Sequence, residues 1–365
     1  MKRSTWLLLM LDVGLVSTHT LYKWILDTKK RFTYDPDRSN PLGVYNWPFT
    51  FPECSGIHQS PIDIRTDQVQ YGSDCACPQF IFKEYTVHGE FENNGHSPTF
   101  TLSNPGALKI KDVPFTNGTF ELNDFHLHFG GTKGRLGEIQ GMDFRGNTVM
   151  SAGSEHTIDG QRYDGELHFV FANNKYKNLE VAEKEKDGVV IIVIFVTKTP
   201  DFFKYKGQTT QFSSLLDRFI PSIRQLGLKA STSVDLTMFF NKPCEYYTYF
   251  GSTTTPECHE SVRWIILRDP IMATERTLFE LTKLQSRGDF NRRFGNYRTT
   301  QPLNDRVVVA NFQKPTQRGY IDMSALVRQK MWRLYRLNRL RLMNIHYRYK
   351  LMQQYLQIMH LMHRG

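Results

Sequence analysis

The uninterrupted apolar run at residues 189–196 constrains the fold more strongly than any other stretch of the chain. It reads Val-Val-Ile-Ile-Val-Ile-Phe-Val, without a polar residue. Its β-branched side chains favour a strand over a helix. Because polar and apolar residues do not alternate in it, both faces of that strand must be covered. We therefore predict a strand at the centre of a sheet that is packed on both sides.

Shorter strand-like runs precede this segment in the sequence. They cover residues 79–82, 99–102, 107–110, 120–129 and 165–171, and turn-forming residues separate them. Helical patterning is limited to residues 212–226, which Pro221 interrupts, and 273–285. The chain has no internal repeat. These patterns predict a single sheet-dominated domain over residues 28–315.

The N-terminus, residues 1–20, has the order of a secretory signal. Two basic residues follow Met1, an apolar run covers residues 6–11, and small polar residues stand at 17–18. Asp12 interrupts the run, so the alternative is an uncleaved, partly buried N-terminal segment. No other segment is apolar enough to span a bilayer.

The C-terminal tail, residues 316–365, carries most of the excess positive charge. From Ser324 onward it contains nine Lys and Arg and no acid, whereas the formal net charge of the whole chain is +10. Its apolar residues spread around a helix instead of forming one face. Three interpretations stay open: a helix on an anionic membrane or polyanion, a coiled-coil segment, or a loosely ordered tail. No specific nucleic-acid partner is expected.

The cysteines and one sequon bear on the compartment of the protein. Five cysteines cannot all pair within one chain; they are Cys54, Cys75, Cys77, Cys244 and Cys258. Asn117 begins an Asn-Gly-Thr sequon, which is a glycosylation site only if the chain enters the secretory pathway.

Three histidines are candidate metal ligands. His126 and His128 are two residues apart in a strand-like run, which places both imidazoles on one face of a strand. His168 lies in another such run. Three converging imidazoles hold Zn²⁺ and leave one coordination position open, as in catalytic sites. The alternative is three separate polar residues on half-exposed strands.

Six motifs, with these histidines as one of them, occur in the order found in α-class carbonic anhydrases of the secreted or membrane-associated type, which residues 30–313 resemble. They are Gln59-Ser60-Pro61-Ile62-Asp63-Ile64, Asn93-Asn94-Gly95-His96, His126-Leu127-His128 with His168, Ser154-Glu155-His156-Thr157, Gly251-Ser252-Thr253-Thr254-Thr255-Pro256 and Gln301-Pro302-Leu303-Asn304-Asp305-Arg306. The resemblance implies a β-dominated α+β fold: one domain around a large, mostly antiparallel, twisted central sheet with few short peripheral helices. It also implies a zinc enzyme that reversibly hydrates CO2 to bicarbonate and a proton through attack of zinc-bound hydroxide.

The resemblance assigns roles around the metal. The zinc ligands are His126, His128 and His168. Glu166 accepts a hydrogen bond from the third ligand, Thr254 orients the hydroxide, and Glu155 accepts from Thr254.

Proton release and substrate binding are assigned in the same way. His96 matches the proton-shuttle position, with Tyr34, Asn94 and Thr99 along the water path. The CO2 pocket corresponds to Val170, Ile191, Thr253, Thr255, Val262 and Trp264. Cys54 and Cys258 match the disulfide of exported family members. This match supports a secreted or extracellular location, with the protein either free or associated with a membrane.

Some positions depart from the family pattern. Asp124 replaces a Gln next to the first ligand, and its negative charge should raise the pKa of the zinc water. Thr253 replaces a Leu, and Ile191 a smaller Val. The segment at 132–153 is longer than in short family members. A second hypothesis is therefore a catalytically weak carbonic-anhydrase-like binding module that acts through this insertion and the basic tail.

Overall fold

The computed structural model describes residues 32–72, 75–132, 151–199, 210–240, 244–286 and 294–314. Of these residues, all those up to Phe312 except Thr199 belong to one compact unit. The predicted signal at 1–20, the tail at 316–365 and most of the insertion at 132–153 lie outside the described residues. Within the described part, no helix is both long and apolar enough to cross a membrane.

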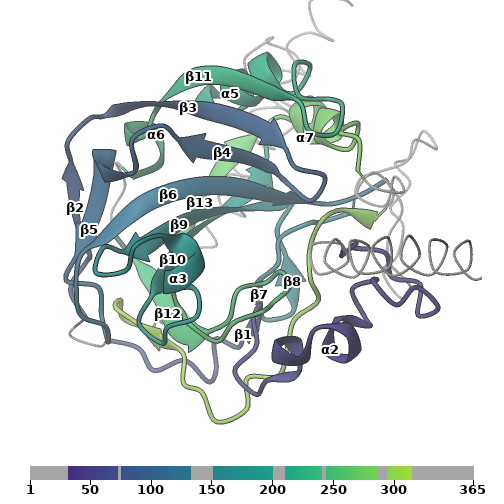
Figure 1. The fold of residues 1–365 in the computed structure, drawn as a ribbon. Helices are drawn as coiled ribbons and strands as arrows, with labels where there is room; N and C mark the ends of the chain where they lie inside the picture. Colours follow the sequence, from purple (N-terminus) through teal and green to yellow (C-terminus); the bar gives the residue numbers. More distant parts are fainter. Residues whose placement is uncertain are drawn as a thin grey trace, which may run out of the picture. The chain divides into compact units, whose positions relative to one another are not determined.

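Strands dominate the structure (Figure 1). They are β1 (Asp63–Ile64), β2 (Gln79–Phe82), β3 (Thr86–Asn93), β4 (Pro98–Leu102), β5 (Leu108–Lys111), β6 (Phe120–Phe129), β7 (Thr157–Ile158), β8 (Gln161–Arg162), β9 (Gly165–Asn173), β10 (Val189–Lys198), β11 (Lys229–Asp235), β12 (Tyr246–Gly251), β13 (Val262–Ala273) and β14 (Val309–Ala310). The helices are short: α2 (Trp47–Thr50), α3 (Leu179–Ala182), α5 (Gln211–Phe219), α6 (Thr237–Phe240) and α7 (Glu275–Leu281), with 3-10 turns η1 (Pro52–Ser55) and η2 (Pro105–Ala107).

One sheet of eleven strands organises the fold. Its order is β11-β3-β4-β6-β9-β10-β13-β12-β14, with β5 on β6 and β2 on β5. Neighbouring strands in it run antiparallel, except β10 and β13, which are parallel. A three-stranded sheet, β1-β7-β8, stands apart from it. The predicted fold class, a single domain around a large, mostly antiparallel twisted sheet with few short helices, is confirmed.

The apolar run at residues 189–196 is the buried central strand that its sequence predicts. It lies in β10, between β9 and β13, and all eight residues are buried. Alternate side chains enter different cores: Val190, Ile192 and the residues in phase with them join one apolar cluster, and Val189 and Ile191 with their counterparts join the other. A buried side chain of this kind contributes on the order of 2 kcal/mol, so β10 couples the two cores.

The predicted alternation of β6 is also confirmed. Phe125, Leu127 and Phe129 point into the first of these cores. His126 and His128 therefore lie on the opposite face of the sheet. That face carries the candidate site.

The predicted helices are present but shorter than their patterns suggested. The first is α5, which ends at Phe219 instead of continuing to residue 226, because Pro221 lacks the N–H that a continuing helix needs. The second is α7, which also covers only part of its predicted span. Thr210 and Thr274 cap the two N-termini by accepting main-chain N–H bonds.

Candidate metal and catalytic site

Two adjacent strands bring three histidines together. His126 on β6 is the cross-strand partner of His168 on β9. The ring centroids are 5.2 Å apart for His126 and His128, 5.1 Å for His126 and His168, and 4.5 Å for His128 and His168. One nitrogen of each ring lies within 4.8 Å of the others. This convergence fits a single ion held by three imidazoles.

Two of the imidazoles are oriented through their Nδ1 atoms. His126 Nδ1 lies 3.2 Å from Oδ1 of Asp124, and His128 Nδ1 donates to the main-chain oxygen of Asn296 at 2.6 Å. The other nitrogen of His128, Nε2, is buried and makes no hydrogen bond to any residue that the structure describes. Because a buried nitrogen without a partner is unfavourable, this atom fits the role of a metal ligand.

Glu166 orients the third imidazole. Its Oε1 accepts from His168 Nε2 and from His156 Nδ1, each at 2.7 Å. Its Oε2 accepts the main-chain N–H groups of Glu155 and His156, each at 2.8 Å. Burial opposes ionisation, but the charge and hydrogen bond of His156, together with those of His168, hold the pKa of Glu166 well below its usual range. Glu166 is therefore an ionised acceptor that fixes His168.

Burial keeps two of the ligand candidates, His128 and His168, neutral. It lowers the pKa of His128 well below the ordinary value, and repulsion from His168 and His126 adds to the effect. Burial likewise lowers the pKa of His168 to about 4. Metal binding requires the unprotonated imidazole, so at neutral pH these rings are ready to bind. Three imidazole nitrogen donors with fixed orientations fit a zinc ion.

Glu155 is buried behind these ligands. Its Oε1 accepts the main-chain N–H of Arg298 at 2.7 Å, and its Oε2 lies 3.5 Å from His128 Nε2. Burial and the Glu166 carboxylate raise the pKa of Glu155 to about 8, whereas the Thr254 hydroxyl and Arg298 act to lower it. A cation held by the histidines would favour the ionised form, because opposite charge stabilises a carboxylate.

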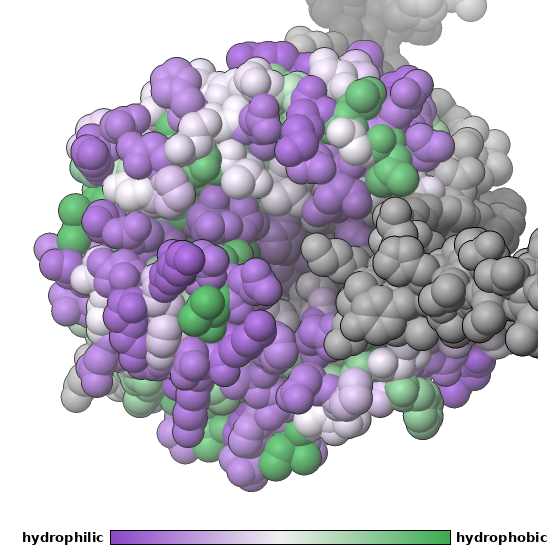
Figure 2. All heavy atoms as spheres, viewed as in Figure 1, coloured by the Kyte–Doolittle hydropathy of each residue, from purple (hydrophilic) through white to green (hydrophobic). Residues whose placement is uncertain are grey.

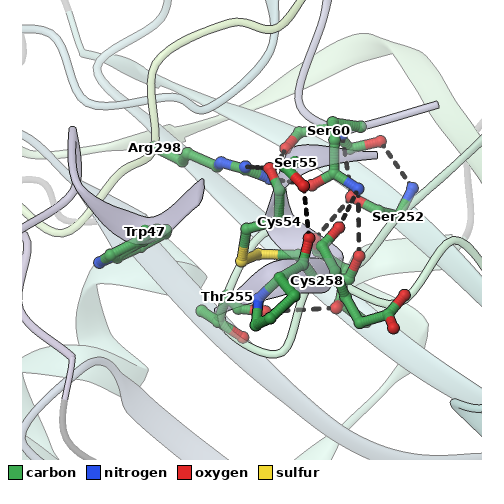
Figure 3. Close-up of a disulfide and its surroundings, with 12 residues drawn as sticks. Trp47, Cys54, Ser55, Ser60, Ser252, Thr255, Cys258 and Arg298 are labelled. Carbon is green, nitrogen blue, oxygen red and sulfur yellow. Dashed lines mark hydrogen bonds between the residues drawn. A yellow bond between two sulfur atoms is a disulfide. The ribbon is translucent and has the colours of Figure 1, made fainter. Parts of the chain in front are cut away.

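A disulfide between Cys54 and Cys258 holds the loop that carries Thr254 (Figure 3). The two Cα atoms are 4.9 Å apart, an ordinary separation for a disulfide. Arg298 links this bridge to the site, since its guanidinium donates to the main-chain oxygen of Cys54 at 3.2 Å while its main-chain N–H binds Glu155. The disulfide and the buried acid are thus joined through one residue.

The loop of His96 is built on Asn94. The Asn94 side-chain oxygen accepts the main-chain N–H groups of His96 and Ser97 at 2.8 and 2.9 Å, and its amide donates to Thr99 Oγ1 at 3.1 Å. Thr99 is the cross-strand partner of His126. Asn94 and Thr99 therefore connect the His96 loop to the histidine cluster.

Tyr34 lies close to this loop through an aromatic cluster. Its ring contacts Phe32 and Trp47 edge-on, with centroids 5.8 and 5.5 Å apart. Phe32 in turn stacks on His96. The structure thus brings together all four residues that the sequence assigned to proton transfer, namely His96, Tyr34, Asn94 and Thr99.

An apolar patch borders the histidines on the other side. Val170, Ile191 and Trp264 are in register across β9, β10 and β13. Val262 begins β13 and is buried with them. The ring of Trp264 is 5.1 Å from that of His168. These four side chains therefore form one apolar wall beside the cluster.

Thr253 and Thr255 flank Thr254 and are half-buried. The Thr253 hydroxyl donates to the main-chain oxygen of Thr255 at 3.3 Å, and its main-chain N–H donates to His259 at 3.0 Å. Both threonines thus lie in the turn that the disulfide closes.

Figure 2 shows a largely hydrophilic face that is hollowed near its middle, below β6. The predicted glycosylation residue Asn117 lies in an exposed turn before β6. Of the insertion at 132–153, only Thr132 and residues 151–153 are described.

Sequence reasoning missed Asn296 and Arg298. The Asn296 side chain accepts the main-chain N–H of Phe129 at 2.7 Å and donates to the main-chain oxygens of Leu127 and His96 at 2.9 and 3.0 Å. It therefore ties the His96 loop to the strand of two ligand candidates. No local pattern reveals this role, because the partners are main-chain atoms some 170 to 200 residues away.

The chain is similar in sequence to known proteins. A family model described as eukaryotic-type carbonic anhydrase matches residues 42–312. Carbonic anhydrase 6 of Canis lupus familiaris is 32% identical over 282 residues, which cover 76% of this chain and 80% of the relative. Carbonic anhydrase 6 of Mus musculus is 30% identical over 82% of this chain and 87% of the relative. For carbonic anhydrase 1 of Monodelphis domestica the identity is 31%, over 74% of this chain and 95% of the relative.

Proposed function

The chain belongs to the eukaryotic-type carbonic anhydrase family, enzymes that interconvert CO2 and bicarbonate, and from this premise we propose that its activity depends on zinc held by His126, His128 and His168. One observation carries the proposal. One nitrogen from each of three imidazoles lies within 4.8 Å of the others, and each ring has its second nitrogen bonded to an acceptor that fixes it.

Zinc, when bound, supplies Lewis-acid chemistry that makes water nucleophilic near neutral pH. The three ligands are uncharged, so they leave its positive charge undiminished. Glu166 holds His168 in the required tautomer, and Asn296 does the same for His128. The role of these residues is to orient the ligands before any substrate arrives.

Thr254 and Glu155 orient the nucleophile in this proposal. The Glu155 carboxylate is fixed by the Arg298 main-chain N–H, and the Thr254 hydroxyl lies close enough to lower the pKa of that carboxylate. If Thr254 donates its proton to Glu155, its oxygen is left only as an acceptor. It then accepts a hydrogen bond from the attacking water and aims the lone pair of that water at the substrate.

The wall of Val170, Ile191, Val262 and Trp264 suits an uncharged apolar substrate such as CO2. These side chains are buried and adjoin His168. They offer no strong hydrogen bonds that would favour the charged product, so CO2 is bound weakly beside the metal and bicarbonate is released. Thr253 and Thr255 complete the wall at its rim.

His96 removes the proton in this proposal. Imidazole is the side chain best suited to accept and release a proton near neutral pH. The hydroxyls and amide of Tyr34, Thr99 and Asn94 order the water between His96 and the metal.

An exported location is the second part of the proposal. The Cys54–Cys258 disulfide is the kind of bridge that persists in oxidising compartments, and the sequon at Asn117 is exposed. The signal-like residues 1–20 agree with this location. The alternative function, a binding module acting through the insertion and the tail, rests mainly on residues outside the described part, and no observation favours it.

A hydration assay tests the function directly. We expect the zinc-loaded chain to hold one zinc ion and to hydrate CO2 in stopped-flow measurements far above the buffer rate. His128→Ala should lose zinc and activity together, whereas His88→Ala, which changes an exposed histidine on β3, should behave like the unchanged protein. Zinc-loaded protein that hydrates CO2 no faster than buffer would overturn the proposal.

A further inference from the structure

Three of the five cysteines are thiols in the structure, and they lie near one another. Cys75 and Cys77 precede β2, and Cys244 precedes β12. Cys75 and Cys244 pack against the larger apolar core, whereas Cys77 is exposed. Either Cys75 or Cys77 could therefore pair with Cys244.

The contacts favour Cys77. Its Sγ lies 3.1 Å from the main-chain oxygen of Cys244. Because that oxygen is two bonds from the Cys244 Cα atom, the Cys77 side chain reaches the Cys244 backbone itself. A change of side-chain rotamer is then enough to bring the two sulfur atoms together.

Other hydrogen bonds hold the two segments in this position. The Tyr246 hydroxyl donates to the main-chain oxygen of Ala76 at 2.8 Å, directly between the two cysteines of the first segment. Asn311 donates to the main-chain oxygen of Cys244 at 2.8 Å and accepts the main-chain N–H of Tyr246 at 2.9 Å. The backbone at both ends of the sulfur pair is therefore fixed before any bond forms.

We propose that Cys77 and Cys244 form a second disulfide, closed by exchange with a small-molecule disulfide such as oxidised glutathione. The Cys77 thiolate attacks one sulfur of the small molecule and forms a mixed disulfide with that half, while the other half leaves as a thiolate that takes up a proton. The Cys244 thiolate then attacks the Cys77 sulfur and releases the second small-molecule thiol. Two protein thiols are oxidised and one external disulfide is reduced, so electrons and protons balance.

The order of the two steps follows from the surroundings. Burial and a hydrogen bond with the Cys77 thiol raise the pKa of Cys244. Cys77 is exposed and meets the external disulfide first. Cys75 stays a thiol in this assignment because Cys77 is the residue whose Sγ contacts Cys244.

This bridge would close a second long loop, because the paired residues are 167 positions apart. The segment from Cys244 to Cys258 contains β12 and Thr254, so it would be tied at both ends: by Cys77 at its start and by Cys54 at its finish. The pairing is independent of whether the site hydrates CO2.

Thiol counting on the full chain tests the proposal. After equilibration with reduced and oxidised glutathione and denaturation in an alkylating agent, we expect one free thiol per chain instead of three. Non-reducing peptide mapping should recover a cross-linked peptide that contains Cys244. Three remaining thiols, or a disulfide between two chains, would contradict the proposal.

Matched variants identify the partner. Cys77→Ser and Cys244→Ser should each abolish the cross-linked peptide, and Cys75→Ser should retain it. A cross-link that survives in Cys77→Ser would show that Cys75 is the partner and overturn the assignment. If a variant does not fold, the unchanged protein can be alkylated with one label before reduction and with a second label after it. Cys75 should then carry the first label and Cys77 the second, which identifies the partner of Cys244.

Discussion

The ring of Phe32 lies nearly parallel to the imidazole of His96, with centroids 3.9 Å apart and planes inclined by 13°. Phe32 is itself held edge-on by Trp47, with ring centroids 5.1 Å apart. His96, the proposed proton carrier, is therefore restrained by Phe32, which lies at the start of the described residues. An aromatic contact of this kind stabilises one ring orientation by about 1 kcal/mol.

Phe32→Leu tests this restraint. It keeps apolar bulk but removes the stacking surface. The His96 ring should therefore spend less time in the half-exposed orientation that meets the buffer. We expect turnover in weak buffer to fall by up to about fivefold, the factor that corresponds to about 1 kcal/mol. Stopped-flow hydration in weak buffer and in concentrated imidazole measures the effect. In concentrated imidazole the variant and the unchanged protein should have the same turnover. A lower turnover of the variant that persists there would point to damage elsewhere in the site.

Asn296→Ala should weaken both the fold and the metal site. It removes the side-chain bonds to Phe129, Leu127 and His96 and leaves buried main-chain groups unpaired, each at a cost of about 1 to 3 kcal/mol. We expect urea unfolding to show a loss of about 3 kcal/mol or more, and chelator competition to show zinc binding weaker by roughly tenfold. Asn174→Ala, on an exposed asparagine, is the matched control and should change neither quantity.

Asp124→Gln should move the pH–rate profile. The Asp124 carboxylate lies 3.2 Å from His126 Nδ1 and adds negative charge beside the metal ligands. Negative charge disfavours loss of a proton from nearby water, so removing it should lower the pKa that governs hydration. We expect the midpoint of the profile to shift down by about one unit, a common size for the effect of one nearby charge. An upward shift, or none, would mean that Asp124 does not tune the site.

Glu183 should make stability depend on pH. This half-buried residue follows α3, and burial together with the charges of Asp124 and Glu180 raises its pKa to about 7. The folded protein therefore keeps a proton that the unfolded chain releases between about pH 4.5 and pH 7. This contribution to stability is fully present below about pH 4.5 and is lost as the pH rises through 7.

Glu183→Gln removes that dependence. We expect the variant to be more stable than the unchanged protein by about 1 to 2 kcal/mol near pH 8.5, with the two nearly equal near pH 4.5. Urea unfolding at both pH values measures this, with a chelator present so that no bound cation adds its charge. Glu185→Gln, on an exposed neighbour, should behave like the unchanged protein at both values.

Much of the fold could be predicted because it depends on local pattern. The β-branched run in β10 and the alternation in β6 are properties of consecutive residues, and each implies which face must be covered. The extents of α5 and α7 were less predictable. Helical periodicity continues past Phe219, but the end of the helix depends on Pro221 and on packing against neighbours.

The sequence by itself determined which three histidines are proposed as ligands and the chemistry proposed for them. His126 and His128 face the same way because a strand alternates its side chains, and the motifs around them indicate the family. Only the tertiary structure decided what holds the set in place. The main-chain oxygen of Asn296 and the main-chain N–H of Arg298 bind the side chains of His128 and Glu155, which are distant in sequence. Phe32 meets His96 only because two loops converge. Such contacts depend on three-dimensional proximity, which no spacing along the chain encodes.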